Sequence, residues 1–324
     1  MKKISIEEHW GTPEIAKIKD EWVERTGLPW SVNLSEVPFV SQRIGDFEKY
    51  RLPIMDEAGI TMQVLSTGSP GIQGIEERGR AISLAKRIND LQAEIIKRYP
   101  GRFAGFACLP TQDPREAARE LERTVTQLGF KGAMVQGHTN FEYLDEEKFW
   151  VLWECAEALG VPIYLHINDP CREVRKMYEG HPELMGPIWS WGVEAATHAL
   201  RIIGAGVFDE FPKAILILGH LGESLPYLLG RLDEGYVMAF KRKRLKRLFS
   251  EYIRGNILIT TSGKYRPEAL LCAVSAMGVD RVLFAVDYPY VDPRESVGLV
   301  EKTPLSDEEK EKIYHLNAER WLKI

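Results

Sequence analysis

The sequence predicts an α/β fold, a (β/α)₈ TIM barrel. Apolar runs alternate with segments of helical periodicity along its 324 residues. Several of these runs also end in a side chain that can bind a metal ion. The strands of a parallel barrel all end at one rim, so such side chains would meet there. Alternation over this length fits a closed barrel better than an open sheet, and we expect a single domain covering residues 1–324.

The strand candidates are short apolar runs bounded by turn residues. Most are nearly continuous rather than alternating, as expected for parallel strands that are covered on both faces. We expect strands at residues 3–9, 61–67, 103–109, 132–137, 162–167, 214–220, 257–263 and 282–288.

The segments between these strands have the spacing of amphipathic helices. In one of them Asp113 is a plausible N-cap, Pro114 takes the first helical position and Gly129 stops the helix. Helices are expected at residues 76–99, 113–129, 145–159, 190–205, 224–238, 241–254, 266–277 and 306–322.

Residues 11–50 do not follow the alternation. They are mixed, aromatic and charged, and they come directly after the first strand, on the rim where the strands end. Long excursions of this kind commonly form a lid over a site or an oligomer contact. Trp22, Trp30 and Phe39 could wall an aromatic ligand there, or they could simply pack.

Two groups of residues are expected inside the core. Trp189 and Trp191 lie on either side of a helix start, where we expect core packing. The four cysteines have no CxxC spacing, so buried free thiols in a reducing compartment are the preferred interpretation. They are Cys108, Cys155, Cys171 and Cys272.

The composition is that of a globular protein, with 44% hydrophobic and 27% charged residues. A net charge of −5 gives no reason to expect a nucleic-acid partner. The basic run at residues 241–247 is interpreted as a solvated helix face or a subunit contact. No apolar leader follows Met1 and no stretch is long enough to cross a membrane, so we expect a cytoplasmic protein.

The opening strand carries Glu7-x-His9, and strand alternation turns these two side chains toward one face. His166 and Asp287 stand at the ends of two later strand candidates. Two imidazoles and two carboxylates suit one Zn²⁺ or Mn²⁺ ion. A single strand-end histidine is usually a core residue, but four ligand-type residues at one rim predict a metal site. Glu8 should face the helix layer instead.

His220 ends the sixth strand candidate, and Glu223 follows three residues later. His220 could be a fifth metal ligand or an acid/base group beside the metal. Glu223 could orient the imidazole, or it could be an acidic first-turn residue favoured by the helix dipole. The residues alone leave these alternatives open.

Short motifs are spread over essentially the whole chain. They are Glu7-x-His9, Arg51-Leu52, Met55-Asp56, Gly59-Ile60, Tyr164-Leu165-His166, Gly180-His181-Pro182, Thr197-His198-Ala199-Leu200-Arg201, Leu218-Gly219-His220-Leu221-Gly222-Glu223, Thr260-Thr261-Ser262-Gly263 and Asp287-Tyr288-Pro289. Together they resemble the amidohydrolase superfamily and, within it, the metal-dependent hydroxybenzoate decarboxylase branch of γ-resorcylate and 2,3-dihydroxybenzoate decarboxylases.

The resemblance implies a non-oxidative decarboxylase that acts on an ortho-hydroxybenzoate-type aromatic acid. It also implies one divalent metal ion per chain, Zn²⁺ or Mn²⁺, and a homo-oligomer, either a dimer or a tetramer. Protonation of the carboxylate-bearing ring carbon would precede loss of CO₂. Asp287 is the donor implied by the family, with His220 and Glu223 tuning the phenol.

The resemblance also implies residues for the substrate carboxylate. Arg231 matches an arginine that the family uses there, although a surface ion pair with Asp233 or Glu234 is the alternative. Arg51 is a second candidate.

Two departures weaken a hydrolytic interpretation. Hydrolytic members usually have His-x-His where this chain has Glu7-x-His9, and many carry a bridging carboxylated lysine that residues 132–137 lack. A mononuclear metal-dependent hydrolase or hydratase remains the alternative, followed by a non-catalytic binding barrel. Tyr288 after Asp287, and Asn168-Asp169 after the fifth strand, differ from the benzoate branch and leave the substrate pocket open.

Overall fold

The strands all run parallel and follow the predicted order. The computed structural model describes residues 1–27, 38–239 and 245–324. The strands are β1 (Ile4–Trp10), β2 (Met62–Thr67), β3 (Phe103–Gly105), β4 (Ala107–Cys108), β5 (Ala133–Gln136), β6 (Ile163–His166), β7 (Leu216–Leu218), β8 (Ile257–Thr260) and β9 (Val282–Leu283). They pair in the order β1-β2-β3 and β4-β5-β6-β7-β8-β9.

Backbone hydrogen bonds join the last strand segment to the first. The Ile6 N–H donates to Phe284 O at 3.1 Å, the Asp287 N–H to Glu7 O at 2.9 Å and the His9 N–H to Tyr288 O at 2.7 Å. β3 and β4 follow one another, and the expected strand 103–109 is interrupted between them at Phe106. The predicted barrel is therefore confirmed, with strand pairing that is irregular at two points.

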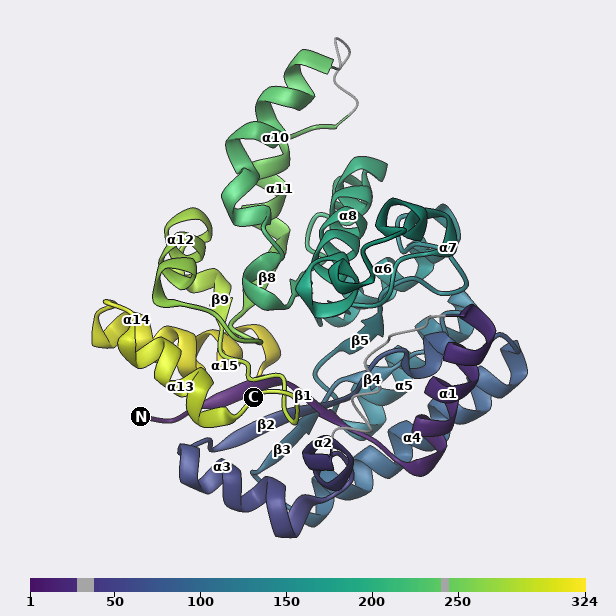
Figure 1. Cartoon of the computed structure of the whole chain (residues 1–324), viewed down its shortest axis with the longest axis vertical. Coiled ribbons are helices and arrows are strands. Elements are labelled where there is room, and N and C mark those ends of the chain that lie inside the picture. The colour runs from purple at the N-terminus through teal and green to yellow at the C-terminus, as the bar shows by residue number, and fades with distance from the viewer. Residues whose placement is uncertain (28–37, 240–244) are drawn as a thin grey trace.

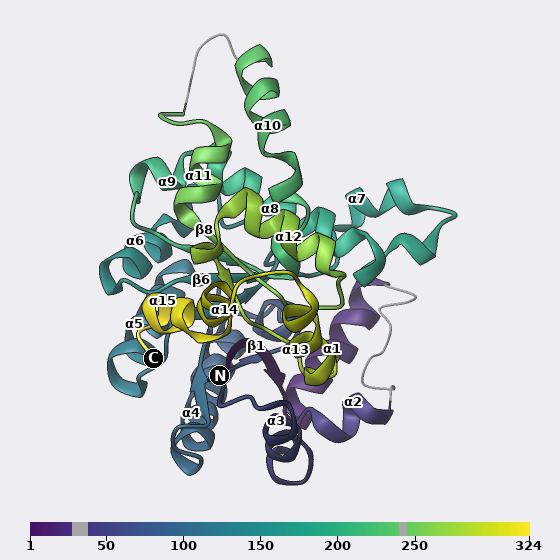
Figure 2. The same cartoon turned by 90° about the vertical axis from the view of Figure 1, so that its left-hand side faces the viewer.

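The helices surround the strands, and α10 projects away from the rest of the molecule (Figures 1 and 2). They are α1 (Pro13–Thr26), α2 (Pro38–Arg43), α3 (Leu52–Ala58), α4 (Arg78–Arg98), α5 (Pro114–Leu128), α6 (Trp150–Leu159), α7 (Arg172–Arg175), α8 (Ser190–Ala205), α9 (Val207–Glu210), α10 (Leu225–Ala239), α11 (Phe249–Asn256), α12 (Pro267–Met277), α13 (Pro293–Lys302), α14 (Asp307–Glu311) and α15 (Asn317–Leu322). In the described residues, no helix is long and apolar enough to span a bilayer.

The core has two apolar layers. One includes Ile4, Ile6, Val64 and Tyr164 and lies inside the ring of strands, while a larger one fills the space between strands and helices. A bulge between Ser5 and Glu8 shifts the pairing of β1 with β2. Because a bulge re-aims the side chains that follow it, β1 changes from even-numbered to odd-numbered residues on its inner face. This irregularity places Glu7 above Ile4 and Ile6.

The expected helix 241–254 is wrong at its start. Residues 241–244 lie outside the described part, residues 245–248 are not helical, and α11 begins at Phe249. The backbone N–H groups of Leu245 and Arg247 donate to the hydroxyls of Tyr236 and Tyr252, at 2.9 and 3.1 Å. Side-chain acceptors thus replace the carbonyls that a helix would have used.

The expected core residues are partly wrong. Trp189 is 54% exposed, and Trp191 is half-buried against a cavity. All four cysteines are free, as expected, but only Cys108 among them is buried. Apolar runs do not distinguish a residue that faces the core from one that faces a cavity or solvent.

The excursion 11–50 begins with α1, and two side-chain hydrogen bonds attach this helix to the barrel. The guanidinium of Arg25 donates to Gly74 O at 3.1 Å, and that of Arg175 donates to Thr26 O at 3.0 Å. Trp30 lies outside the described residues, and Phe39 is 42% exposed.

Candidate metal centre

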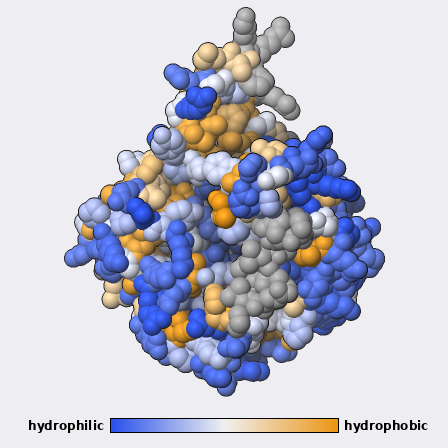
Figure 3. Space-filling view, viewed as in Figure 1, coloured by the Kyte–Doolittle hydropathy of each residue, from blue (hydrophilic) through white to orange (hydrophobic). Residues whose placement is uncertain are grey.

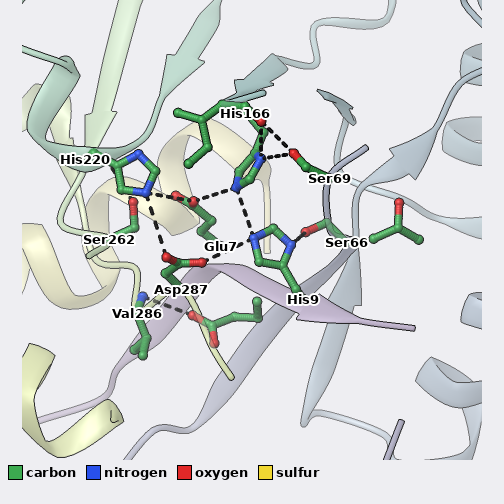
Figure 4. Close-up of polar contacts among 12 residues, drawn as sticks. Glu7, His9, Ser66, Ser69, His166, His220, Ser262, Val286 and Asp287 are labelled. Atoms are coloured by element: carbon green, nitrogen blue, oxygen red, sulfur yellow. Dashed lines mark hydrogen bonds and ion pairs between the residues drawn. The ribbon is translucent and has the colours of Figure 1, made fainter. Parts of the chain in front are cut away.

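Four side chains converge at the carboxyl ends of the strands. Glu7, His9, His166 and Asp287 each offer one ligand atom, and these atoms lie within 4.8 Å of one another. His9 Nε2 is 3.1 Å from His166 Nε2 and 3.4 Å from Asp287 Oδ1. Figure 4 shows the four side chains pointing toward one another. The sequence prediction that these residues meet is borne out.

Asp287 reaches this point through an unusual backbone conformation. The expected strand 282–288 is a regular strand, β9, only at Val282–Leu283, although Tyr288 forms an isolated parallel bridge with Glu8. Asp287 has a φ of +75°, in the left-handed region that asparagine and aspartate tolerate better than most residues. The chain therefore leaves the strand geometry where its carboxylate enters the site.

The hydrogen bonds around His166 leave a lone pair directed into the cluster. His166 Nδ1 lies 3.0 Å from the Ile167 carbonyl, which can only accept, so Nδ1 carries the proton. Burial lowers the pKa of His166, which favours the neutral ring. Nε2 then presents a lone pair, as a metal-binding histidine does.

Glu7 is oriented and ionised in the same cluster. Its Oε2 accepts hydrogen bonds from the Tyr164 hydroxyl and, at 3.3 Å, from Thr260 Oγ1. Burial raises the pKa of Glu7, but the nearby charge of His220 opposes this effect most strongly, and the net shift is downward.

A divalent cation fits this arrangement. Glu7 Oε1 is buried without a hydrogen-bond partner, and the nearby Nε2 of neutral His166, at 3.3 Å, has no proton to donate. An unpaired buried acceptor beside an imidazole lone pair is costly for a protein alone. The same atoms form the mixed nitrogen and oxygen ligand set of Zn²⁺ or Mn²⁺.

His220 and Glu223 lie beside the four ligands. His220 Nε2 is 3.6 Å from Glu7 Oε1 and 3.8 Å from Asp287 Oδ2. Its Nδ1 is 2.6 Å from Glu223 Oε1. Burial lowers the pKa of His220. The neighbouring carboxylates of Glu223, Glu7 and Asp287 raise it by more, so the net shift is upward. His220 stands outside the four-atom cluster, and of its two open alternatives this position favours an acid/base group over a fifth ligand.

The alternative role for Glu223 is wrong. Glu223 has a φ of +50° and precedes α10, which starts at Leu225. It is therefore not a first-turn residue of that helix. Its carboxylate instead makes the contact with His220 Nδ1.

Neither arginine lines the cavity at the metal-binding residues. Arg51 is completely buried and donates to His9 O and, at 3.0 Å, to Gln63 Oε1. Arg231 is exposed on α10 and lines a second cavity with Leu228 and Tyr236. Within one chain, the structure does not bring either predicted carboxylate-binding residue to the site.

A cavity of about 540 Å³ opens from the metal-binding residues. α1 contributes Trp22, so one of the three predicted aromatic residues lines it. Its walls also include Trp191, Tyr265 and Tyr290, which the sequence analysis did not assign to a site, and Asp169, which it noted only as a departure after the fifth strand. The signal that could have found three of them is position, because Asp169, Tyr265 and Tyr290 each follow the end of a strand.

The chain matches the family model described as Amidohydrolase over residues 10–324. It is 38% identical over 330 residues to γ-resorcylate decarboxylase from Polaromonas sp., covering 99% of this chain and 98% of that protein. This chain therefore belongs to the amidohydrolase family, in the group of the γ-resorcylate decarboxylases.

Solved structures agree with this placement. The crystal structure of 2,6-dihydroxybenzoate decarboxylase from Rhizobium superposes with a TM-score of 0.90 at 37% identity, covering 100% of this chain and 99% of that one. A dihydroxybenzoic acid decarboxylase from Polaromonas sp., with bound manganese and the inhibitor 2-nitroresorcinol, gives a TM-score of 0.90 at 38% identity, covering 99% and 96%. The fold and the metal-binding character predicted from the sequence are thus confirmed.

Proposed function

We propose that this protein is a metal-dependent, non-oxidative decarboxylase of an ortho-hydroxybenzoate-type aromatic acid. The observation that carries the proposal is the juxtaposition of the Glu7, His9, His166 and Asp287 cluster with the His220–Glu223 pair at the end of one cavity. Relatives at 37–38% identity over 99% of the chain are γ-resorcylate decarboxylases, which supports the same reaction class.

The reaction needs a proton at the ring carbon before the carbon–carbon bond breaks. Direct loss of CO₂ would leave a carbanion in an sp² orbital that the ring cannot delocalise. A divalent ion held by Glu7, His9, His166 and Asp287 would supply Lewis-acid binding of the carboxylate and the ortho oxygen. The protein side chains then have to place an acid against the ring face.

Asp287 is the proposed proton donor. Its Oδ1 faces His9 and its Oδ2 faces His220 Nε2, so one carboxyl group touches both the ligand cluster and an acid/base partner. In the acid form it protonates the ring carbon, and the C–C bond electrons return to the ring as CO₂ leaves. Glu223 holds His220 in position to replace the proton.

The test is CO₂ release from a panel of ortho-hydroxybenzoates by the purified manganese- or zinc-loaded protein. We expect turnover of at least one member, none of the matching para-hydroxybenzoates, and loss of activity after chelation that added metal restores. An acid product without CO₂ would favour the hydrolase or hydratase alternative.

Asp287→Asn should lower kcat by about 10²–10⁴-fold, the usual contribution of a general acid. Asp56→Asn is the matched control, because Asp56 is 65% exposed and pairs with Arg102. Near-normal turnover of Asp287→Asn would contradict the role of Asp287.

We also propose a homo-oligomer, a dimer or a tetramer. Exposed side chains on α10 support it, because Tyr227 is 80% exposed, Met238 79% and Val237 54%. Figure 3 shows hydrophobic surface on this projecting part of the molecule. Arg231 lies on the same helix, so its proposed contact with the substrate carboxylate requires a second copy of the chain. Sedimentation as a monomer at micromolar concentration would contradict both proposals.

A single-domain organisation of residues 1–324 and a cytoplasmic location also remain proposals. The four free cysteines support the location, because unpaired thiols are typical of a reducing compartment.

A further inference from the structure

One wall of the cavity carries a carboxylate that neither the metal cluster nor the proton transfer uses. Asp169 is only 3% exposed and lines the cavity with Trp191 and Lys19. Its Oδ1 accepts a hydrogen bond from Trp191 Nε1 at 2.7 Å. In the described part of the chain, no group donates a hydrogen bond to Oδ2. This oxygen is not one of the fully buried side-chain atoms that lack a partner, so it keeps some contact with solvent.

The backbone of Asp169 is held from several directions. His138 Nε2 lies 3.0 Å from Asp169 O and donates to it. The side chain of Asn168 accepts from the Asp169 N–H at 2.9 Å and donates to Gln136 O at 3.0 Å. Asp169 therefore extends from a hydrogen-bonded segment after β6, and its carboxylate has a defined place in the wall.

The surroundings of this carboxylate favour a hydrogen-bond donor as its partner. Burial raises the pKa of Asp169, while Trp191, Arg175 and Lys19 act in the opposite direction. The same cavity includes the apolar side chains of Trp22 and Ile188. When an aromatic ring displaces water from such a cavity, a carboxylate oxygen in the wall loses its hydration. Without a new hydrogen-bond donor, this loss is not compensated.

We propose that Asp169 determines substrate specificity by accepting a hydrogen bond from a second donor on the aromatic ring. The ligand class is an ortho-hydroxybenzoate that bears a further hydroxyl or amino group, directed away from the metal-binding residues. This inference rests on the proposed function and adds to it the substituent that the wall recognises. A methoxy group at that position cannot donate, and a second carboxylate would face a like charge.

The test compares one dihydroxybenzoate with its derivative methylated at the second hydroxyl. The wild type should prefer the dihydroxy compound. In Asp169→Asn, whose carbonyl can still accept from Trp191 while its amide faces the substrate, kcat/KM for the dihydroxy compound should fall about 10–100-fold. The methyl ether should change less than about threefold, because it makes no hydrogen bond to lose.

Two further variants keep the test sharp. Glu194→Gln is the matched control, because Glu194 is 5% exposed, binds Tyr143 at 2.7 Å and does not line this cavity. Its substrate ratio should equal that of the wild type. Trp191→Phe keeps an aromatic wall but removes the donor to Asp169 Oδ1, and it should reduce the preference by several-fold. This variant also serves if Asp169→Asn does not fold.

Calorimetric binding of the diphenol product separates the inference from the proposed function. Asp169→Asn should weaken binding of the diphenol by about tenfold or more relative to binding of the diphenol's monomethyl ether. This result would support the inference even if no panel member is decarboxylated. An unchanged substrate ratio and unchanged diphenol affinity would overturn it while leaving decarboxylation intact. Wild-type preference for the methyl ether or for a second carboxylate would also overturn it.

Discussion

Glu7 and Glu8 are adjacent in β1 and both are completely buried, but they face opposite sides of the strand and differ in their hydrogen-bond partners. On the inner side, Glu7 Oε1 has no hydrogen-bond partner. On the outer side, Glu8 shares a hydrogen bond with the Ser5 hydroxyl and accepts from Gln63 Nε2 at 2.8 Å and from the Val286 N–H at 3.1 Å. Burial alone does not identify a functional carboxylate. The unmet hydrogen bond does.

The two glutamates differ in charge as well. Burial raises the pKa of Glu8 to about 8, although Ser5 and Arg51 oppose it, so Glu8 is mostly neutral at pH 7. Burial also raises the pKa of Glu7, but the charge of His220 keeps it low. One side of β1 thus holds an anion for a cation to bind, and the other holds a hydrogen-bonded acid.

The largest expected effect separates these two residues. Glu7→Gln should lose metal and lower turnover by more than about 100-fold, which exceeds the usual effect of losing a residue that only orients a ligand. Glu8→Gln replaces a neutral acid with a neutral amide, so metal content should be unchanged and turnover should fall less than about tenfold. Metal analysis and kcat measure both variants, and equal losses would contradict the distinction.

A smaller effect is expected where α8 approaches Glu223. A Cβ atom added at Gly192 would lie 2.6 Å from Glu223 Oε2. Gly192→Ala should displace that carboxylate from His220 and lower kcat about 10–100-fold. The unfolding midpoint should stay constant or rise, because alanine favours a helix by about 1 kcal/mol over glycine.

Gly204→Ala is the control on the same helix, because a Cβ there would have nothing within 4 Å. It should keep full activity. Full activity of Gly192→Ala as well would show that the position of Glu223 does not matter.

The smallest effect concerns His198, which lies on α8 outside the metal cluster. Burial lowers its pKa to about 3, against 6.5 for the free side chain. The unfolded chain therefore binds more protons, and stability falls as the pH drops from about 6.5 toward 3. In the wild type, His198 lowers the unfolding free energy by about 1.4 kcal/mol for each pH unit of acidification in that range. This contribution should be absent from His198→Gln. Denaturant titrations at pH 6, 5 and 4 measure the slope.

His181→Gln is the histidine control, because the side chain of His181 is 69% exposed. It should keep the wild-type slope. An identical slope in His198→Gln would show that acid sensitivity arises elsewhere.

The metal cluster could be predicted because it depends on short-range rules. Glu7 and His9 share a face through strand alternation, and His166 ends a regular strand. Even there, the bulge in β1 and the left-handed Asp287 were not foreseen. Both follow from pairing with distant strands, about which a local pattern says nothing.

The cavity wall was harder to predict because it is built from loops, from one helix of the excursion and from the start of α8. Asp169 and Trp191 meet through a hydrogen bond across 22 residues, which neither periodicity nor spacing indicates. Arg51 shows the reverse case. The family resemblance suggested substrate binding, but its burial against His9 O places it beneath the site. Whether a polar residue supports a site or lines it depends on tertiary packing.

Metal analysis combined with anomalous diffraction at the manganese edge tests the central claim most directly. Crystals of the manganese-loaded protein should show one anomalous peak per chain, within ligand distance of Glu7, His9, His166 and Asp287. Glu7→Gln should lose this peak while Glu8→Gln keeps it. A peak elsewhere, two peaks per chain, or activity in protein that retains no metal would contradict the account.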